Sequence, residues 1–464
     1  MWYDNVSYQE RNGSIMKFNR DSLRRFTPAQ IIVFYYFLAI AFSFLLLNLP
    51  GVYKPGVEIS FIDSLFTSVS AVSVTGLTPI SIGGTYTVFG LCMLMLVLQL
   101  GGIGIMSIGT FFWLLVRKRI GLRERQLIMV DHNQYSLAGV VQLIKQIVWI
   151  IFLIELIGGL VLTLYIMPLY ESLSEALLNG MFLAVSATTN AGFDITNASL
   201  LPYFNDYFVQ TVIMILIILG AIGFPVLVEV KSFFSKKVPH FRFSLFTKIT
   251  TATFGVLLIG GAVLIFILES FHSFRGMAWH EKVFSSLFHS VSARSAGLTT
   301  YDITNFGDAT DILISILMFI GASPSSVGGG IRTTTFAIAI LFLINFAKGK
   351  DVIHIFQRRI TLVDIFRSYA VILLAGFMVI AAMLILLITE PGVPVVSLLF
   401  EITSAFGTCG MSLGITADLS VPGKIIIMAL MFIGRVGLIS FLFTLGGKVY
   451  KTSFRYPKER VIIG

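Results

Sequence analysis

Four short polar runs, each ending in glycine, interrupt otherwise apolar sequence. They occupy residues 70–76, 186–192, 292–297 and 404–410, and their last glycines lie between 105 and 116 residues apart. A nearly fixed spacing of this length indicates one structural unit used four times. Glycine can turn backbone carbonyls towards a common axis, where a ring of carbonyl oxygens can replace the water around a cation. We therefore expect the four runs to meet around an axis and to line a cation pore.

The candidate filter residues are the last three of each run. They are Val74, Thr75, Gly76, Asn190, Ala191, Gly192, Ser295, Ala296, Gly297, Thr408, Cys409 and Gly410. Four ordinary helix ends with C-cap glycines are the alternative, but four such runs on one side of the membrane favour the pore. The runs differ in sequence, and the third carries Arg294. Such a mixed ring predicts weaker selectivity than four identical strands would give.

The composition places the chain in a membrane. Only 12% of its 464 residues are charged and 56% are hydrophobic, whereas soluble domains carry about 25% charged residues. A crossing needs about 20 apolar residues, and the first 28 residues show no signal peptide. We expect eight spanning segments, at residues 31–50, 86–116, 148–167, 208–230, 245–268, 312–346, 369–389 and 425–445.

Lysine and arginine cluster in five segments that alternate with the polar runs, at residues 11–25, 117–145, 231–248, 348–367 and 448–460. The positive-inside rule places these segments in the cytoplasm, so both termini are expected inside and the polar runs enter from outside. We attribute the net charge of +9 to anionic lipid head groups rather than to nucleic acid. A cytoplasmic partner could use the same surface. Cys92 and Cys409 indicate neither a disulfide nor a metal site.

Each polar run follows a segment that is helical but too short to cross a membrane. These half-helices are expected at residues 60–72, 172–187, 277–293 and 394–405. Ser60 with Asp63 and Ser172 with Glu175 match the capping-box pattern and place two of the N-termini at the outer surface. The C-termini then point into the membrane, where their partial negative charges favour a cation.

A glycine-rich break divides the apolar segment at residues 312–346. Proline and three consecutive glycines cannot sustain a helix there, and the pattern of a phosphate-binding loop is absent. We expect a flexible intramembrane gate over residues 321–335, formed by Gly321, Ser323, Pro324, Ser325, Ser326, Gly328, Gly329, Gly330, Arg332, Thr333 and Thr334.

Arg435 lies midway through the last apolar segment. An arginine near the middle of a membrane costs about 2.5–3.5 kcal/mol on insertion scales, so its side chain should face the protein interior. Two interpretations remain open. Arg435 either projects into the pore as a barrier to cations, or pairs with carbonyls or with an acid, in the latter case as a salt bridge that locks two units together.

Taken together, these motifs resemble the Trk/Ktr/HKT superfamily of potassium transporters, most closely the bacterial Ktr-type membrane subunit. The resemblance covers residues 27–464 and is carried by Asn190–Phe193, Ser295–Gly297, Phe406–Gly410 and Phe432–Arg435, with the break and the C-terminal Arg455-Tyr456-Pro457. It implies potassium as the transported ion, the twelve residues above as its filter, and residues 321–335 with Arg435 as the gate. It also implies a homodimer and a cytosolic ring of regulatory domains that bind ATP or ADP and sometimes a cyclic dinucleotide. The chain itself is expected to need no cofactor.

The predicted fold is an all-α polytopic membrane protein with four helix–pore-helix–filter-loop–helix repeats around one pore. The repeats are expected at residues 27–120, 121–236, 237–350 and 351–464, after an N-terminal extension at 1–26. The predicted function is potassium uptake rather than an enzymatic reaction, and the sequence leaves sodium stimulation open. An ion-coupled carrier of an organic solute is the alternative. Such carriers usually show inverted repeats and acidic coupling residues, and this chain has few intramembrane acids.

Overall fold

The computed structural model describes residues 27–104, 107–110, 121–131, 139–196, 198–235, 241–350, 352–438, 440–441, 457 and 459. The predicted N-terminal extension and nearly all of the predicted C-terminal tail lie outside these residues. The described part is mostly helical, with one two-residue hairpin in which β1 (His354–Ile355) pairs antiparallel with β2 (Arg358–Arg359).

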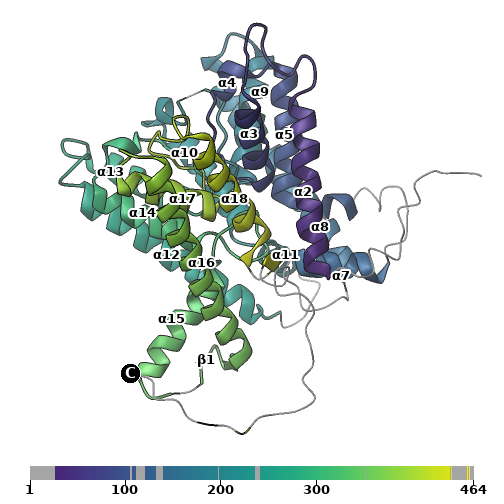
Figure 1. The fold of residues 1–464 in the computed structure, drawn as a ribbon, viewed down its shortest axis with the longest axis vertical. Helices are drawn as coiled ribbons and strands as arrows, with labels where there is room; N and C mark the ends of the chain where they lie inside the picture. Colours follow the sequence, from purple (N-terminus) through teal and green to yellow (C-terminus); the bar gives the residue numbers. More distant parts are fainter. Residues whose placement is uncertain are drawn as a thin grey trace, which may run out of the picture.

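Along the chain a long helix is followed by a short helix and then by a further helix, here called the second helix, in agreement with the sequence pattern (Figure 1). The long helices are α2 (Pro28–Leu47), α8 (Val140–Ile166), α12 (Leu245–Glu269) and α16 (Leu362–Thr389). The short helices are α3 (Phe61–Ser73), α9 (Leu173–Thr188), α13 (Trp279–Ser292) and α17 (Val395–Gly407). The second helices are α5 (Val88–Ile103), α10 (Tyr207–Ala221) with α11 (Phe224–Phe234), α14 (Asp308–Ile320) with α15 (Thr333–Ala347), and α18 (Val421–Val436).

Smaller elements connect these helices. They are α4 (Ile82–Thr85), α7 (Leu122–Asp131) and the 3₁₀ turns η1 (Met167–Leu169), η2 (Leu201–Tyr203) and η3 (Ile303–Asn305). In Figure 1, α15, the first turns of α16 and the hairpin extend from one end of the molecule. The basic residues Lys348, Arg358 and Arg359 belong to this projection.

The short helices lie within one or two residues of the predicted half-helices. The Ser60 hydroxyl accepts the Asp63 N–H (3.1 Å), and the Ser172 hydroxyl accepts the Glu175 N–H (3.2 Å). These bonds satisfy otherwise unpaired donors at the two helix N-termini, which explains why α3 and α9 begin where they do.

Four described helices are long and apolar enough to cross a membrane: α2, α8 with η1, α12 and α16. A fifth crossing results if α10 and α11, which meet at an angle of 104°, count as one broken span. The long helices direct large apolar side chains outward, such as Phe152, Val256 and Phe377, each more than half exposed. Such surfaces suit a lipid environment. The predicted number of eight crossings stays a prediction.

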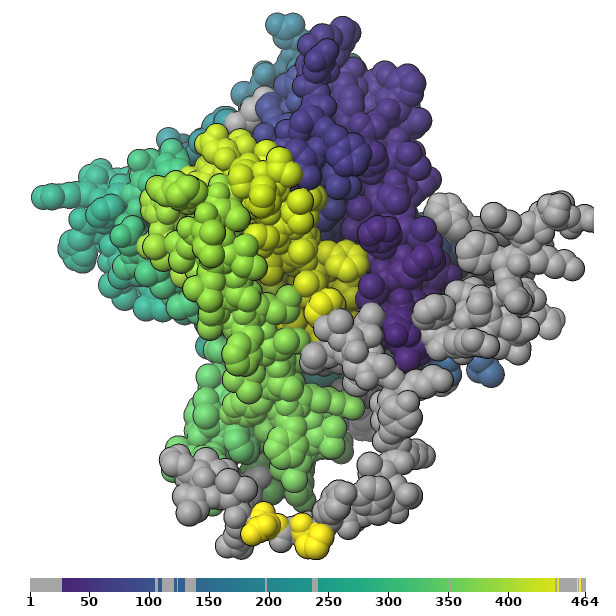
Figure 2. Space-filling model, viewed as in Figure 1, coloured from purple at the N-terminus to yellow at the C-terminus, as the bar shows by residue number. Residues whose placement is uncertain are grey.

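The helices pack in a closed cycle. Each long helix contacts the short helix that follows it, and each second helix contacts the short helix of the next part of the chain. The latter pairs are α5 with α9, α10 with α13, α14 with α17, and α18 with α3. The last pair joins the end of the chain to its beginning. In Figure 2 the yellow C-terminal helices accordingly lie between the purple N-terminal part and the green third part.

Candidate functional site

The four polar runs lie side by side in a ring. A Cβ atom on Gly76 would collide with the Ala191 carbonyl oxygen, and one on Gly192 would lie 2.7 Å from that of Ala296. In the same way Gly297 lies against the Cys409 carbonyl and Gly410 against the Thr75 carbonyl. Each glycine therefore touches the residue before the next glycine, and the fourth contact returns to the first run.

All four glycines also have positive φ angles, of 93°, 67°, 74° and 99° in chain order. Only glycine adopts such angles without strain. Glycine is thus required twice at each position, for its backbone conformation and because a neighbouring carbonyl leaves no room for a side chain.

The residue two positions before each glycine shares a second feature. These four residues have positive φ angles although none is glycine: Val74 (57°), Asn190 (54°), Ser295 (93°) and Thr408 (48°). Such conformations cost about 1–3 kcal/mol each and persist only where the surroundings enforce them. All four side chains are fully buried. The recurrence means that the chain turns at the same point in each run, which the residue types alone do not reveal.

A serine at the start of each run ties the run together. The Ser70 and Ser404 hydroxyls each accept the N–H of their own run's final glycine (3.0 Å). The Ser186 and Ser292 hydroxyls instead donate to the carbonyls of Phe193 (2.7 Å) and Leu298 (2.5 Å). The sequence signal for this role was present, because a serine occurs at the start of every run.

The glycine-rich break contacts the ring directly. Gly328 packs against Ser295 and Gly329 packs against Thr408, two residues of the candidate filter. The Ser295 hydroxyl also donates to the Thr408 carbonyl (2.6 Å), which joins the third run to the fourth. The predicted gate residues and the predicted filter residues are therefore brought together.

On its other side the break is bonded to the bend between α10 and α11. The Ser323 N–H donates to the Ala221 carbonyl (3.1 Å), and the Val327 N–H donates to that of Gly220 (3.3 Å). In the reverse direction the Phe224 N–H donates to the Ser325 carbonyl (2.7 Å). The bend, which the sequence analysis did not single out, thus belongs to the same site.

The loop is shorter than predicted. Helix α15 begins at Thr333, so Thr333 and Thr334 belong to its first turn and not to the break. The irregular segment ends at Arg332, which has a φ of 84° and donates to the carbonyls of Gly328 and Ser323. These bonds fold the end of the loop back on its own backbone.

Arg435 binds backbone carbonyls. Its guanidinium donates to Val327 of the loop and to Gly101 and Gly102 at the end of α5. The side chain is 7% exposed, and no described carboxylate forms a salt bridge with it. Arg435 thereby connects three segments, which are α18, the loop and α5.

Other buried polar groups hold helices together. Lys424 near the start of α18 pairs with Asp63 of α3 at 2.8 Å, and Gln99 of α5 donates to Glu155 of α8. Glu401 of α17 accepts a bond from Thr416 (2.5 Å). The His289 ring bonds the Ser285 carbonyl (2.8 Å).

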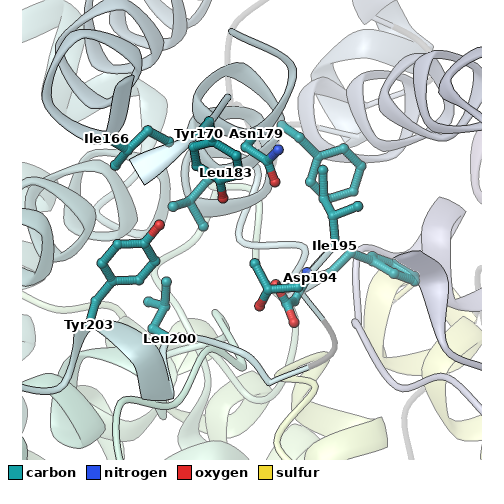
Figure 3. Close-up of a pocket in the computed structure, with 11 residues that line it drawn as sticks. Ile166, Tyr170, Asn179, Leu183, Asp194, Ile195, Leu200 and Tyr203 are labelled. Carbon is teal, nitrogen blue, oxygen red and sulfur yellow. Dashed lines mark hydrogen bonds between the residues drawn. The ribbon is translucent and has the colours of Figure 1, made fainter. Parts of the chain in front are cut away.

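A small pocket lies beside the second run, between the end of α8, helix α9 and the loop after Gly192 (Figure 3). Its volume is about 20 Å³, which is enough for one water molecule. The Asp194 carboxylate at its edge accepts the N–H groups of Thr196 and Ser199, both at 2.8 Å. Asp194 therefore stabilises the loop that follows the second run. The described residues contain no group of three or more His, Cys, Asp or Glu side chains that could hold a metal ion.

Residues 17–447 match the family model "TrkH: Cation transport protein". The chain belongs to this family. The resemblance seen in the sequence is thereby confirmed. TrkH-family proteins are multi-pass proteins of the plasma membrane that transport cations and are not enzymes.

Named relatives are similar over nearly the whole chain. The Ktr system potassium uptake protein D of Bacillus subtilis is 54% identical, over 95% of this chain and 98% of its own length. The Ktr system potassium uptake protein B of the same organism is 37% identical, over 95% and 97%. The potassium/sodium uptake protein NtpJ of Enterococcus hirae is 32% identical, over 95% and 98%.

A solved structure has the same fold. The crystal structure of the potassium transporter TrkH from Vibrio parahaemolyticus superposes with a TM-score of 0.71 at 18% identity. The match covers 94% of this chain and 86% of that one.

Proposed function

We propose that this protein takes up potassium through a channel-like pore whose selectivity filter consists of backbone carbonyls. The carrying observation is the closed ring of four glycine-ended runs, in which equivalent residues share positive φ angles. The names of the Ktr relatives, which are potassium uptake proteins, support the choice of ion. In the proposal, carbonyls from the runs replace the hydration shell of K⁺.

The proposed architecture is four repeats in pseudo-fourfold arrangement around this pore, with eight crossings and both termini in the cytoplasm. It is supported by the closed packing cycle, in which the second helix of each repeat contacts the short helix of the next. In this arrangement the C-termini of α3, α9, α13 and α17 direct partial negative charges towards the axis.

The proposed gate is the loop at residues 321–332 together with Arg435. The loop contacts the filter runs at Ser295 and Thr408, and Arg435 holds it through the Val327 carbonyl. In this proposal the loop moves to let ions pass. Arg435 holds the closed loop through hydrogen bonds to backbone carbonyls and not through a salt bridge with an acid.

The protein is further proposed to work as a homodimer with a cytosolic regulatory subunit that binds ATP or ADP. Two relatives are membrane subunits of Ktr systems, which work with a separate regulatory subunit. The basic projection of α15 and the hairpin provides a surface for such a partner. Stimulation by sodium is part of the proposal, because one relative is named a potassium/sodium uptake protein.

The test is potassium uptake in a strain that lacks its own potassium transport, with a Ktr regulatory subunit co-expressed. Wild type is compared with Gly297→Ser. In this variant the new side chain meets the Cys409 carbonyl, and the serine backbone must adopt a φ of 74°. We expect wild type to rescue growth at low potassium, and the serine variant to lose preference for K⁺ over Na⁺.

The matched control is Gly276→Ser. Gly276 also has a positive φ, of 92°, but no atom lies near its absent Cβ. It should keep wild-type selectivity. Absence of rescue with the partner present, or a Gly297→Ser variant that behaves like wild type, would instead favour a carrier of an organic solute.

A further inference from the structure

The third filter run contains a buried cation that the other three runs lack. Arg294 follows Ala293, the C-cap residue of α13, and its side chain is fully buried. Its Nη1 donates to the Gly321 carbonyl at 3.4 Å, while Nε and Nη2 have no hydrogen-bond partner among the described residues. No described carboxylate forms an ion pair with it. An unpaired buried charge is costly, so its presence needs an explanation.

Comparison of the four runs shows where this charge lies. Arg294 stands three residues before the final glycine, a position that the other runs fill with Ser73, Thr189 and Gly407. It is therefore at the C-terminus of one short helix of four. The Cys409 thiol of the neighbouring run donates to the Ser292 carbonyl at 3.4 Å, which places Arg294 next to the contact between runs three and four.

The electrostatic consequence follows from the helix dipole. The C-terminus of a helix carries roughly half a negative elementary charge, and a cation placed there cancels it. Three of the four short helices then keep their full negative pole at the ring, and in the fourth the positive charge of Arg294 offsets it. In a low-dielectric interior such a charge repels a cation in the pore more strongly than it would in water.

Resting on the function proposed above, we propose that Arg294 sets the affinity of the pore for K⁺ by weakening cation binding at the filter. Conduction needs sites that bind well enough to admit an ion but weakly enough to release it. The positive charge of Arg294 makes release faster at the expense of affinity. In this role Arg294 determines the affinity of the pore, and the Gly321 carbonyl holds its side chain in position.

The test compares Arg294→Gln, Arg294→Met and Arg294→Lys with wild type in potassium uptake by proteoliposomes. Replacement of a buried charge by a neutral side chain of similar volume is often tolerated, so the two neutral variants are expected to fold. Both should lower the KM for K⁺ by about fivefold or more, the lower range of coupling between two sites, and should also lower the maximal rate. Arg294→Lys retains a basic group and should give values closer to wild type than either neutral variant does.

A second measurement reports binding without transport. Potassium that binds the folded protein raises its thermal midpoint, and in the neutral variants this rise should begin at lower K⁺ concentration. An unchanged or higher KM in both neutral variants, or a lysine variant that behaves like them, overturns the proposal. A merely structural role predicts a higher KM and lower selectivity.

Gly297→Ser, measured beside these variants, distinguishes failure of the proposed filter from failure of the proposed role of Arg294. A result in which wild type transports K⁺ and the serine variant loses selectivity, while the Arg294 variants keep the wild-type KM, supports the proposed filter and rejects the proposed role of Arg294. If wild type shows no K⁺ uptake with its partner, both the proposed filter and the proposed role of Arg294 are rejected.

Discussion

The ring of four runs, which we propose as the filter, and the glycine-rich loop, which we propose as the gate, touch each other but are held in different ways. In the ring, four equivalent runs each place a glycine against a neighbour's carbonyl, and a serine in each run bonds across its own turn. The loop occurs once, between α14 and α15, and bonds to its surroundings mainly at the α10–α11 bend and at Arg435. In the proposed gating, the four runs hold one another in place, whereas the loop breaks its bonds to the bend and to Arg435 and moves.

The comparison separates selectivity from flux. A defect in the ring should change which ion passes, because the spacing of the carbonyls is altered. A defect in the loop should change how many ions pass. The following variants examine this separation, from the largest expected effect to the smallest.

Removal of residues 324–328 should have the largest effect on flux. The deletion removes the carbonyl that Arg435 binds and the contact of Gly328 with Ser295, but keeps Gly321 and its bond to Arg294. Uptake should rise on the order of tenfold, as expected when the open state is a minor population, with the K⁺/Na⁺ ratio largely kept. Rubidium uptake into proteoliposomes measures both quantities, and unchanged flux would exclude the loop as a gate.

Arg435→Gln should have a smaller effect of the same kind. Its bonds to the carbonyls of Val327, Gly101 and Gly102 are lost or weakened, and hydrogen bonds of charged groups contribute about 1.5–3 kcal/mol each. The loop loses one of its anchors, so uptake should rise by less than in the deletion. Lower uptake at normal expression would show that Arg435 supports the pore and does not restrict it.

Lys424→Met should affect stability alone. Lys424 and Asp63 join the last helix to the first short helix at 2.8 Å, far from the loop in sequence. Exposed pairs contribute about 0.2–1 kcal/mol, and this one is only partly exposed, so for a chain of 464 residues the thermal midpoint should fall by about 1 °C. Asp63→Asn provides the matched partner change, and a double variant no worse than either single one would confirm the pairing. A change in ion selectivity would contradict the separation.

The sequence predicted much of this site because its chemistry depends on residue types. Glycines at a near-constant spacing, serines at the start of each run, and capping serines before α3 and α9 each reflect a local requirement of the backbone. The half-helices were therefore located within one or two residues. The loop was predicted two to three residues too long, since Thr333–Thr335 are weak helix formers that nevertheless begin α15.

Other features depend on contacts between distant parts of the chain. The bend between α10 and α11 bonds the loop through three backbone groups, which carry no information in the side chains. The same holds for Arg435, whose partners are carbonyls of residues 101, 102 and 327. The sequence left an acid, backbone carbonyls and the pore open as surroundings of this residue, because it does not show which part of the backbone lies beside Arg435.

By itself, then, the sequence determined a membrane protein and predicted repeated units with a cation filter, because apolar length, charge distribution and glycine spacing are local properties of the chain. Only the tertiary structure decided that the runs close into a ring, that Val74, Asn190, Ser295 and Thr408 turn with positive φ, and that Arg294 is buried without an acid. Ring closure, strain and burial arise when segments far apart in the chain come into contact, and no single segment encodes them.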